Sequence, residues 1–300
     1  MDSVKDSVFS VVKKSIVPPC SVYTQKLNML NKIRHLVFDM DGTIYKGKTI
    51  FPYTLKAFDM FDSCGVSYTY LTNNSSLSAK DYVEKINTLG LRGDAENLYT
   101  SSLATLAYIR KHHPEFHTVY LLGTESLKVE FREAGYSVVS DDTEPDFVVV
   151  AFATDMTYAS LCKSAWWIKQ GKPYFATHPD KICPTDLPTV LIDCGAIYDC
   201  IASATGRMPD KVFGKPDPSM IEGIMEQHGL KPHEMAMVGD RLYTDIEMAR
   251  RAGVMGVLVL SGEATRDDLN KSGLNPELVV ENIMELAEKI KEAGDNSTPP

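Results

Sequence analysis

Short apolar runs alternate along the chain with stretches whose apolar positions recur every three or four residues. The first run, Leu36 to Phe38, is continuous and ends at Asp39, as expected of a strand buried on both faces. The next stretch, "TLKAFDMFDSCG", has helical spacing and stops at Gly65, and "VSYTYLT" then forms a second apolar run. Strand, helix and strand in succession predict a βαβ unit with parallel strands.

The same alternation returns near the end of the chain. There "DPSMIEGIMEQHGL" has helical spacing and stops at Gly229, "MAMVGD" is a strand pattern, "TDIEMARRAG" is a helix pattern and "VMGVLVL" is a further strand. We therefore expect the beginning and the end of the chain to form one parallel-sheet domain, made of residues 32–85 and 205–292.

The middle of the chain has an α/β pattern of its own. Strand patterns occur in "TVYLLG", "FVVVAF" and "PYFATH", and helix patterns in "SSLATLAYIRKHH", "ESLKVEFREAG" and "YASLCKSAWWIKQG". One sheet holding all these strands would exceed the usual size. We therefore expect residues 86–204 to be a second α/β domain inserted into the first, with core packing as the default role of Trp166 and Trp167.

Both ends of the chain differ from this pattern. In the extension of residues 1–31, Val4, Val8 and Val11 have helical spacing and Pro18 ends it, which predicts an amphipathic helix. We favour a helix that packs on the body of the protein over a helix that binds a partner or a membrane. A role of this extension in forming a homodimer stays open. The polar end, "EAGDNSTPP", predicts a flexible tail over residues 293–300.

Composition narrows the class of protein. The 300 residues are 44% hydrophobic and 24% charged, with a net charge of −9 and no strong basic run, which disfavours nucleic acid as a partner. No apolar stretch approaches the roughly eighteen residues of a membrane span, and no signal peptide is evident. The six cysteines include no CxxC pair, which favours reduced thiols in a cytoplasmic protein over a zinc site or a disulfide scaffold.

Two carboxylates follow the first predicted strand. Asp39 and Asp41 in "LVFDMDGT" are separated by one residue, so on an extended chain their side chains point the same way. Ligands of open α/β sheets bind beyond the carboxyl ends of the strands. A simple turn at Asp41-Gly42 explains the pair equally well.

Further polar groups occur at equivalent positions, each with an ordinary explanation of its own. Thr72, Asn73 and Asn74 end the second strand, where loops and helix caps also use such residues; Lys215 lies in "FGKPDP"; Asp240 follows a strand and Asp245 begins a helix. Together they bring four carboxylates, a hydroxyl and a lysine to one sheet edge. Converging carboxylates repel one another unless a cation is present, and Mg²⁺ prefers oxygen ligands. The set predicts a magnesium and phosphate site.

In this order, "DMDGT", "LTNN", "GKP" and "GDRLYTD" resemble the four motifs of the haloacid dehalogenase superfamily of phosphatases. The forms "TNNSS", "GKPDP" and "GDRLYTDI" are similar in particular to its NagD-like, 4-nitrophenylphosphatase-type branch. The resemblance covers most of the chain from about Ile33. It implies a Rossmann-like parallel-sheet core with a large α/β cap inserted between the second and third motifs.

The resemblance also implies roles for the motif residues. Asp39 is the nucleophile that forms an aspartyl-phosphate, and Asp41 protonates the leaving group and then activates water. Thr72, Lys215 and the amide of Asn73 hold and neutralise the phosphoryl group, with Gly42 and Asn74 as further phosphate-binding residues. Mg²⁺ is expected at Asp39, the Asp41 carbonyl, Asp240 and Asp245, the last through water or as an orienting group.

Substrate choice is expected to lie in the cap. In "ATHPDKICP", His178, Pro179 and Asp180 are candidates to contact the leaving group, but His178 is equally well explained as a capping or core histidine. Relatives commonly carry a Gly-rich turn where this chain has "LIDCGAI", so Asp193 and Cys194 depart from the family pattern.

The expected activity is Mg²⁺-dependent hydrolysis of a small phosphorylated metabolite, such as a sugar phosphate, a nucleoside monophosphate, phosphoglycolate or p-nitrophenyl phosphate. One alternative is a phosphomutase, which would use the same aspartate pair but usually has a smaller helical cap. The other is a non-catalytic phosphate-binding regulatory protein, disfavoured because every catalytic position is filled.

Overall fold

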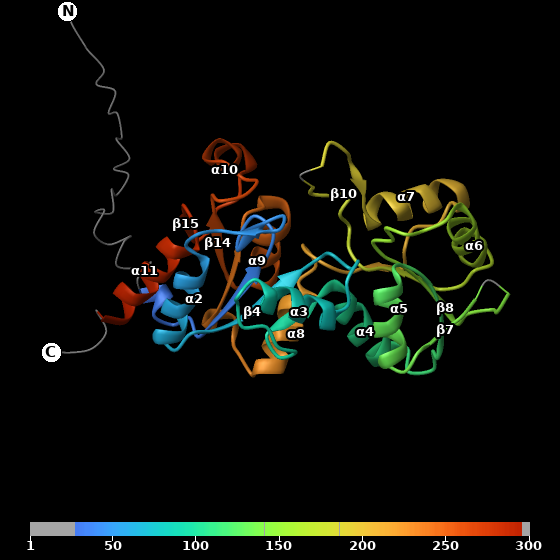
Figure 1. Ribbon diagram of the computed structural model, residues 1–300, viewed down its shortest axis with the longest axis horizontal. Helices are drawn as coiled ribbons and strands as arrows, with labels where there is room; N and C mark the ends of the chain where they lie inside the picture. Colours follow the sequence, from blue (N-terminus) through green and yellow to red (C-terminus); the bar gives the residue numbers. More distant parts are fainter. Residues whose placement is uncertain (1–27, 141, 186, 296–300) are drawn as a thin grey trace, which may run out of the picture.

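The chain folds into two α/β lobes that lie side by side along its long axis (Figure 1). The computed structural model describes residues 28–140, 142–185 and 187–295. In Figure 1 the first lobe, which we call the core, holds the blue, red and orange elements, and the second, the cap, holds the green and yellow ones. This α/β architecture agrees with the fold class that the sequence predicts.

The core is built on a six-stranded sheet in which every neighbouring pair is parallel. Its order is β15-β14-β13-β1-β4-β5, with β1 in the middle. The strands are β1 (His35–Asp39), β4 (Ser67–Thr72), β5 (Leu98–Thr100), β13 (Met235–Gly239), β14 (Met255–Val259) and β15 (Leu278–Val280). All five residues of β1 are buried, as expected of a strand covered on both faces.

Helices cover both faces of the core sheet. One face is packed by α2 (Thr54–Ser63) and α11 (Ile283–Asp295), whose apolar stripes share a cluster with Phe38 of β1. The other face is packed by α8 (Ser219–His228) and α9 (Glu247–Ala252), together with Val37. Further core helices are α3 (Ala79–Thr88) and α10 (Arg266–Ser272). The alternating side chains of β1 therefore join two separate apolar layers.

The cap has its own five-stranded parallel sheet, in the order β12-β9-β8-β6-β7. The strands are β6 (Thr118–Leu122), β7 (Ser137–Val138), β8 (Phe147–Val150), β9 (Tyr174–Ala176) and β12 (Lys211–Val212). The helices are α4 (Ser101–His112), α5 (Glu125–Glu133), α6 (Tyr158–Lys169) and α7 (Cys194–Thr205). Trp167 packs on a cap cluster, but Trp166 is 52% exposed, so the core role expected for Trp166 is wrong.

The sequence pattern placed the domain boundaries at residues 86 and 204. In the structure, the chain passes from one sheet to the other at different residues. Leu98–Thr100 pairs with β4 of the core, because α3 and β5 complete a further βαβ unit of the core sheet. Lys211–Val212 pairs with β9 of the cap. We therefore propose that the inserted domain begins after Thr100 and ends close to Phe213.

Two short antiparallel hairpins lie outside the main sheets. One joins β2 (Tyr45–Lys46) to β3 (Thr49–Ile50) directly after β1, and the other joins β10 (Ile182–Cys183) to β11 (Leu191–Ile192) in the cap. Strands of two residues leave no periodic pattern in a sequence, which is why neither hairpin was predicted.

The ends of the described chain pack more closely than expected. Helix α11 continues to Asp295 and buries Ala293, since its apolar spacing persists that far, so the tail predicted from 293 is wrong for its first three residues. Leu30 belongs to the core cluster. The helix predicted over residues 2–17 lies outside the described residues. Among the helices that are described, none is long and apolar enough to cross a membrane.

Replacing Phe61 tests the packing between α2 and the central strand. Phe61 is fully buried, with its ring centroid 5.4 Å from that of Phe38. The Phe61→Ala cavity should lower the free energy of unfolding by about 3–5 kcal/mol in urea titrations. The control, Lys56→Ala, removes an exposed side chain of the same helix and should change it by less than about 0.5 kcal/mol. Equal losses in both variants would contradict this account of the core.

Candidate active site

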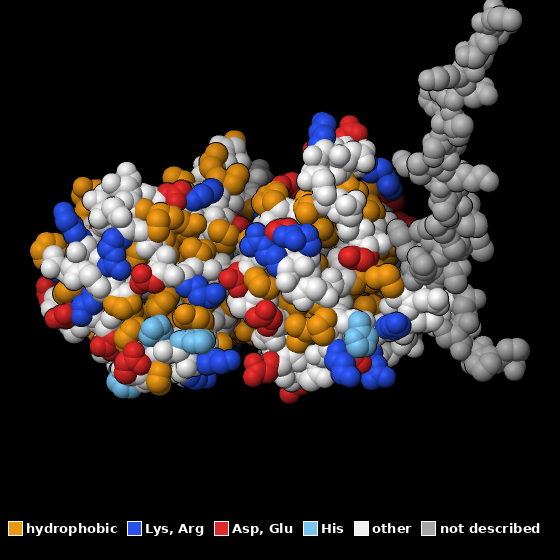
Figure 2. All heavy atoms as spheres, turned by 180° about the vertical axis from the view of Figure 1, so that it is seen from behind, with side chains coloured by type: hydrophobic (Ala, Val, Ile, Leu, Met, Phe, Trp, Pro, Cys, Tyr) orange, Lys and Arg blue, Asp and Glu red, His pale blue; other side chains and the backbone are white. Residues whose placement is uncertain are grey.

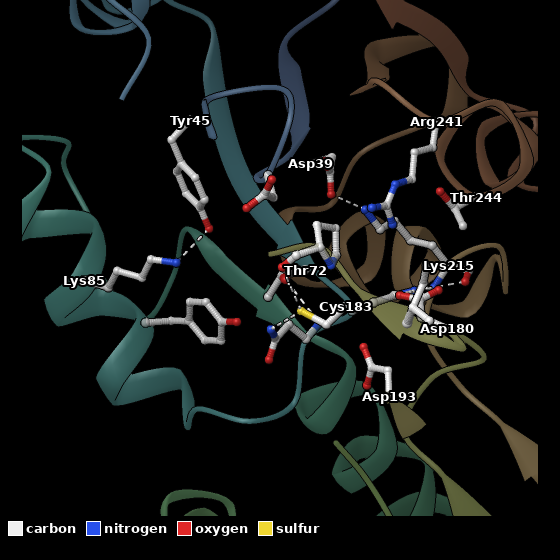
Figure 3. Close-up of a pocket in the computed structure, with 16 residues that line it drawn as sticks. Asp39, Tyr45, Thr72, Lys85, Asp180, Cys183, Asp193, Lys215, Arg241 and Thr244 are labelled. Carbon is white, nitrogen blue, oxygen red and sulfur yellow. Dashed lines mark hydrogen bonds and ion pairs between the residues drawn. The ribbon is translucent and has the colours of Figure 1, made fainter. Parts of the chain in front are cut away.

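The carboxyl ends of three adjacent core strands carry the polar residues picked out by the sequence. Asp39 ends β1, Thr72 ends β4, and Asp240 follows β13. Asp39 is opposite Leu71 in the register of β1 with β4, so Thr72 lies one residue further toward the same edge. Figure 3 shows Asp39, Thr72 and Lys215 around one pocket. A parallel sheet thus gathers side chains that are far apart in sequence.

The turn after β1 requires glycine. Gly42 has φ of +88°, and a Cβ added there would lie 2.3 Å from a carboxylate oxygen of Asp240. Its N–H donates to the Tyr45 carbonyl at 2.7 Å and its carbonyl accepts from Ser261 at 2.8 Å. Both backbone groups are therefore used inside the core, and the phosphate contact expected for Gly42 is not supported.

A buried lysine links two of the candidate carboxylates. Lys215 is 4% exposed, and its ammonium pairs with Asp39 and, at 2.8 Å, with Asp245. Burial alone would lower the pKa of Lys215, but the two carboxylates raise it above its ordinary value. The lysine is therefore a fixed positive charge beside Asp39, and not the solvated surface charge that an isolated loop lysine would be.

Asp39, Asp240 and Asp245 form a cluster suited to a cation. Their carboxylate oxygens come within 4.8 Å of one another. One oxygen of Asp240 accepts from the Glu263 N–H at 2.7 Å, whereas its Oδ1 is buried without a hydrogen-bond partner in the described chain. Burial and the neighbouring carboxylates raise the pKa of Asp240. An unpartnered buried oxygen among oxygen ligands fits Mg²⁺.

Asp245 is positioned by an irregular turn. Residues Leu242–Ile246 form a π-helical turn ahead of α9, where the sequence predicted the beginning of an ordinary helix. The second oxygen of Asp245 accepts from the Arg241 N–H at 3.0 Å, and the side chain is fully buried. Such turns often occur at functional sites. Here Asp245 is directed at Lys215.

The loop after β4 connects the core to the cap through three consecutive residues. Asn73 donates to Asp180 at 3.2 Å, Asn74 donates to the Cys183 sulfur at 3.6 Å, and Ser75 shares a 2.9 Å hydrogen bond with Thr177. The side chains of "TNNSS" thus largely hold the cap in place. Asn73 and Asn74 also line the pocket, and the phosphate contact expected of them stays a prediction.

Asn73 also holds the segment that carries Lys215. Its Oδ1 accepts from the Lys215 N–H at 2.7 Å and its Nδ2 donates to the Lys215 carbonyl at 3.1 Å. Thr72, by contrast, lies on the pocket wall with its hydroxyl accepting from the Asn74 N–H at 3.2 Å. The threonine hydroxyl is therefore available at the pocket, whereas the Nδ2 of Asn73 already donates to both Asp180 and the Lys215 carbonyl.

The pocket between the two lobes has a volume of about 90 Å³. The core residues that line it are Asp39, Asp41, Tyr45, Thr72, Asn73, Asn74, Tyr82, Lys85, Lys215, Arg241 and Thr244. The Oδ2 of Asp41 accepts from the Gly47 N–H at 3.3 Å. From the cap it is lined by Asp180, Ile182, Cys183, Pro184 and Asp193. The pocket therefore lies between core and cap, and its small volume favours a small ligand.

His178 does not line the pocket. It is fully buried behind the pocket wall, 3.6 Å from Asp180 through Nδ1 and 3.3 Å from Asp193 through Nε2. Burial alone would raise the pKa of Asp180, but the contacts with His178 and Asn73 hold it below its ordinary value. The expected substrate contact is thus not supported for His178, and Asp180 and Asp193 are the cap carboxylates at the pocket.

Several pocket residues were missed by sequence reasoning. Arg241 lies within the "GDRLYTD" motif, yet only its aspartates were singled out. Tyr82 and Lys85 lie three positions apart on one face of α3, and Lys85 donates to the Tyr45 hydroxyl at 3.1 Å. Their helical spacing after "TNNSS" was the available signal, because α3 begins just beyond the sheet edge.

The surface opposite the view of Figure 1 is mixed in charge. In Figure 2, Lys and Arg side chains are interspersed with Asp, Glu and apolar ones, and no broad basic face is seen from this side. This matches the net charge of −9.

Comparison with known sequences matches two stretches of the chain to family profiles. Residues 36–137 match the profile of the haloacid dehalogenase-like hydrolases, and residues 212–286 match a second, HAD-hydrolase-like profile. The acid sugar phosphatase of Staphylococcus epidermidis is 30% identical over 240 residues, which are 80% of this chain and 91% of that protein.

Solved structures share the whole two-lobe arrangement. The 4-nitrophenylphosphatase of Thermotoga maritima has a TM-score of 0.82 and 38% identity, covering 87% of this chain and 98% of its own. NagD from E. coli K-12 has a TM-score of 0.76 and 28% identity, covering 84% and 98%. The glycerol phosphate phosphatase of Mycobacterium tuberculosis, solved in complex with magnesium, has a TM-score of 0.79 and 26% identity, covering 88% and 79%.

These matches confirm the resemblance seen in the four motifs. The matched relatives cover 80% to 88% of the chain, and the identity to a phosphatase of known structure reaches 38%. The chain belongs to the haloacid dehalogenase-like hydrolases, in their NagD-like branch.

Proposed function

We propose that the chain is a Mg²⁺-dependent phosphatase that hydrolyses small phosphate monoesters through an aspartyl-phosphate on Asp39. The observation that carries the proposal is the contact of Asp39 with the buried Lys215, beside the unpartnered oxygen of Asp240. The names of its relatives, acid sugar phosphatase, 4-nitrophenylphosphatase and glycerol phosphate phosphatase, all describe phosphate monoester hydrolysis.

In this proposal Asp39 attacks phosphorus and the oxygen of the leaving group departs. Asp41, on the same pocket wall, donates a proton to that oxygen and then takes one from the water that hydrolyses the intermediate. Two displacements on one phosphorus return Asp39 to its starting form, with water consumed and inorganic phosphate released.

The negative charge of the transferring phosphoryl group is stabilised by groups that the fold holds in place. Lys215 neutralises negative charge on the transferring phosphoryl group while it restrains Asp39, and the Thr72 hydroxyl donates to a phosphoryl oxygen. Asp39, Asp240 and Asp245, with the Asp41 carbonyl, would hold Mg²⁺, which when bound supplies positive charge to the phosphoryl oxygens. No side chain of the described cap lining is a cation, so the phosphoryl group itself belongs on the core side.

The size of the cap supports hydrolysis over the phosphomutase alternative. A phosphomutase of this superfamily usually has a small helical cap, whereas this cap contains a five-stranded sheet. The filled positions of Asp39, Asp41 and Lys215 likewise support an enzyme over a phosphate-binding regulator.

Replacing the nucleophile tests the mechanism. Asp39→Asn should abolish Mg²⁺-dependent release of p-nitrophenol from p-nitrophenyl phosphate, because an amide is a poor nucleophile. Asp59→Asn, an exposed aspartate of α2, is the matched control and should keep full activity. Substantial turnover by Asp39→Asn would exclude the aspartyl-phosphate route.

Replacing the lysine tests the electrostatic contribution. Lys215→Met should raise the barrier by about 3 kcal/mol or more, seen as a fall in kcat of roughly 150-fold or more. The variant leaves two carboxylates without their cation, so circular dichroism should first confirm that it is folded. Lys271→Met, in an exposed position of α10, should keep kcat. A folded Lys215→Met variant with unchanged kcat would remove the lysine from the mechanism.

The metal site is tested by binding as well as by activity. A chelator should abolish activity and added Mg²⁺ should restore it. Asp240→Asn should weaken Mg²⁺ binding about 10- to 100-fold in calorimetry, by the loss of one charged ligand. The exposed Asp267→Asn should bind Mg²⁺ as the unchanged chain does. Equal affinities in all three proteins would place the metal elsewhere.

A further inference from the structure

We propose that Asp180 and Asp193, held on either side of His178, select against substrates whose leaving group carries a carboxylate and favour leaving groups that offer hydroxyl donors. This inference rests on the proposed function, because it concerns the group to which the phosphoryl is attached. It assigns the choice between substrate classes to a cluster of side chains in the cap.

Among the described residues, the ionisable side chains on the cap side of the pocket include no cation. Five described cap residues line it: Asp180 and Asp193 are acidic, and Ile182, Cys183 and Pro184 complete the wall. Burial raises the pKa of Asp193, whereas the neighbouring His178 lowers it. Lys181 lies next in sequence, but its ammonium pairs with Asp199 and donates to the Gly195 carbonyl at 3.1 Å. A leaving group between core and cap therefore faces two carboxylates, as Figure 3 shows for Asp180 and Asp193.

His178 fixes the spacing of these carboxylates. Its ring is fully buried, with Nδ1 toward Asp180 and Nε2 toward Asp193, and neither nitrogen has a hydrogen-bond partner among the described residues. The two nitrogens lie on different edges of an imidazole. The aspartates therefore approach the ring at different nitrogens, and one ligand atom of each of the three residues lies within 4.8 Å of the others, so the two carboxylates are close neighbours.

The backbone around Asp193 is equally constrained. Asp193 is the N-cap of α7 and accepts from the Cys194 N–H at 2.6 Å. A Cβ on Gly195 would lie 2.1 Å from the Pro179 carbonyl, so the first turn of α7 packs directly on the segment that carries Asp180. Both carboxylates thus belong to one rigid wall, as a specificity element requires.

On the core side, the cations already have partners. Lys215 pairs with Asp39 and Asp245, and Arg241 lies 2.9 Å from Glu263. Lys85 donates to the Tyr45 hydroxyl and is attracted by Asp41. A carboxylate on the leaving group would have to compete for these cations while it is repelled by the cap. A hydroxyl, in contrast, can donate to either aspartate.

Two substrates that differ at one carbon test the inference. In sn-glycerol 3-phosphate that carbon bears a hydroxyl, and in L-3-phosphoglycerate, which has the same arrangement at the middle carbon, it is a carboxylate. Dissociation constants are measured by calorimetry with Mg²⁺ present, on the Asp39→Asn variant so that neither ligand is consumed. We expect sn-glycerol 3-phosphate to bind at least about tenfold more tightly, from like-charge repulsion across the pocket.

Substitutions of the two cap aspartates separate the effect of their charge on ligand binding from the effect of their shape. Asp193→Asn, added to Asp39→Asn, keeps an N-cap acceptor and nearly the same volume, and should bring the two dissociation constants within about threefold of each other. Asp180→Asn should act in the same direction and serves if the first variant does not fold. Asp155→Asn, an exposed cap aspartate away from the pocket lining, should leave the preference unchanged.

Equal dissociation constants for the two ligands, or a preference that both wall variants leave intact, would overturn the inference. Hydrolysis of p-nitrophenyl phosphate by the unmodified chain is measured alongside, because that ester carries neither a hydroxyl nor a carboxylate. A lack of that hydrolysis would contradict the proposed function, whereas the binding preference would still stand or fall by the dissociation constants.

Discussion

The pairing of Lys215 with two carboxylates is the interaction on which the rest of the site depends. Three carboxylates, of Asp39, Asp240 and Asp245, lie within 4.8 Å of one another. Burial and mutual repulsion would oppose the ionisation of all three, and one buried ammonium offsets only part of that cost. The remaining negative charge is concentrated near the unpartnered oxygen of Asp240, where the proposed Mg²⁺ would complete the balance.

This pairing depends in turn on two features of the chain that are remote from one another. The parallel sheet fixes Asp39 at the end of its central strand, and Asn73 fixes Lys215 by bonding both its N–H and its carbonyl. Residues 39, 73 and 215 meet because βαβ connections return each strand to the same edge. The inserted cap lengthens the chain between Asn73 and Lys215 without moving that edge.

Much of this was predictable from the sequence, for physical reasons. Buried parallel strands produce continuous apolar runs, and Asp39, Thr72 and Asp240 follow directly from where those runs end. What could not be predicted depends on contacts between distant segments. The hydrogen bonds of the Asn73 and Asn74 side chains to Asp180 and Cys183 are an example, because the partners lie more than 100 residues away. Likewise, a two-residue strand such as β10 leaves no period to detect, and the burial of His178 depends on its neighbours.

The loop after β4 connects the segment of Lys215 to the cap. Asn73 bonds to the segment of Lys215 and to Asp180, so the lysine beside the nucleophile and the acidic wall of the cap share a single anchor. Any movement of the cap away from the core must break this contact, together with the hydrogen bond of Ser75 to Thr177. The two bonds of Asn73 to the backbone of Lys215 and the ion pairs of Lys215 with Asp39 and Asp245 do not involve the cap, so the charge arrangement around Asp39 is built by the core, and Asn73 sets the cap against it.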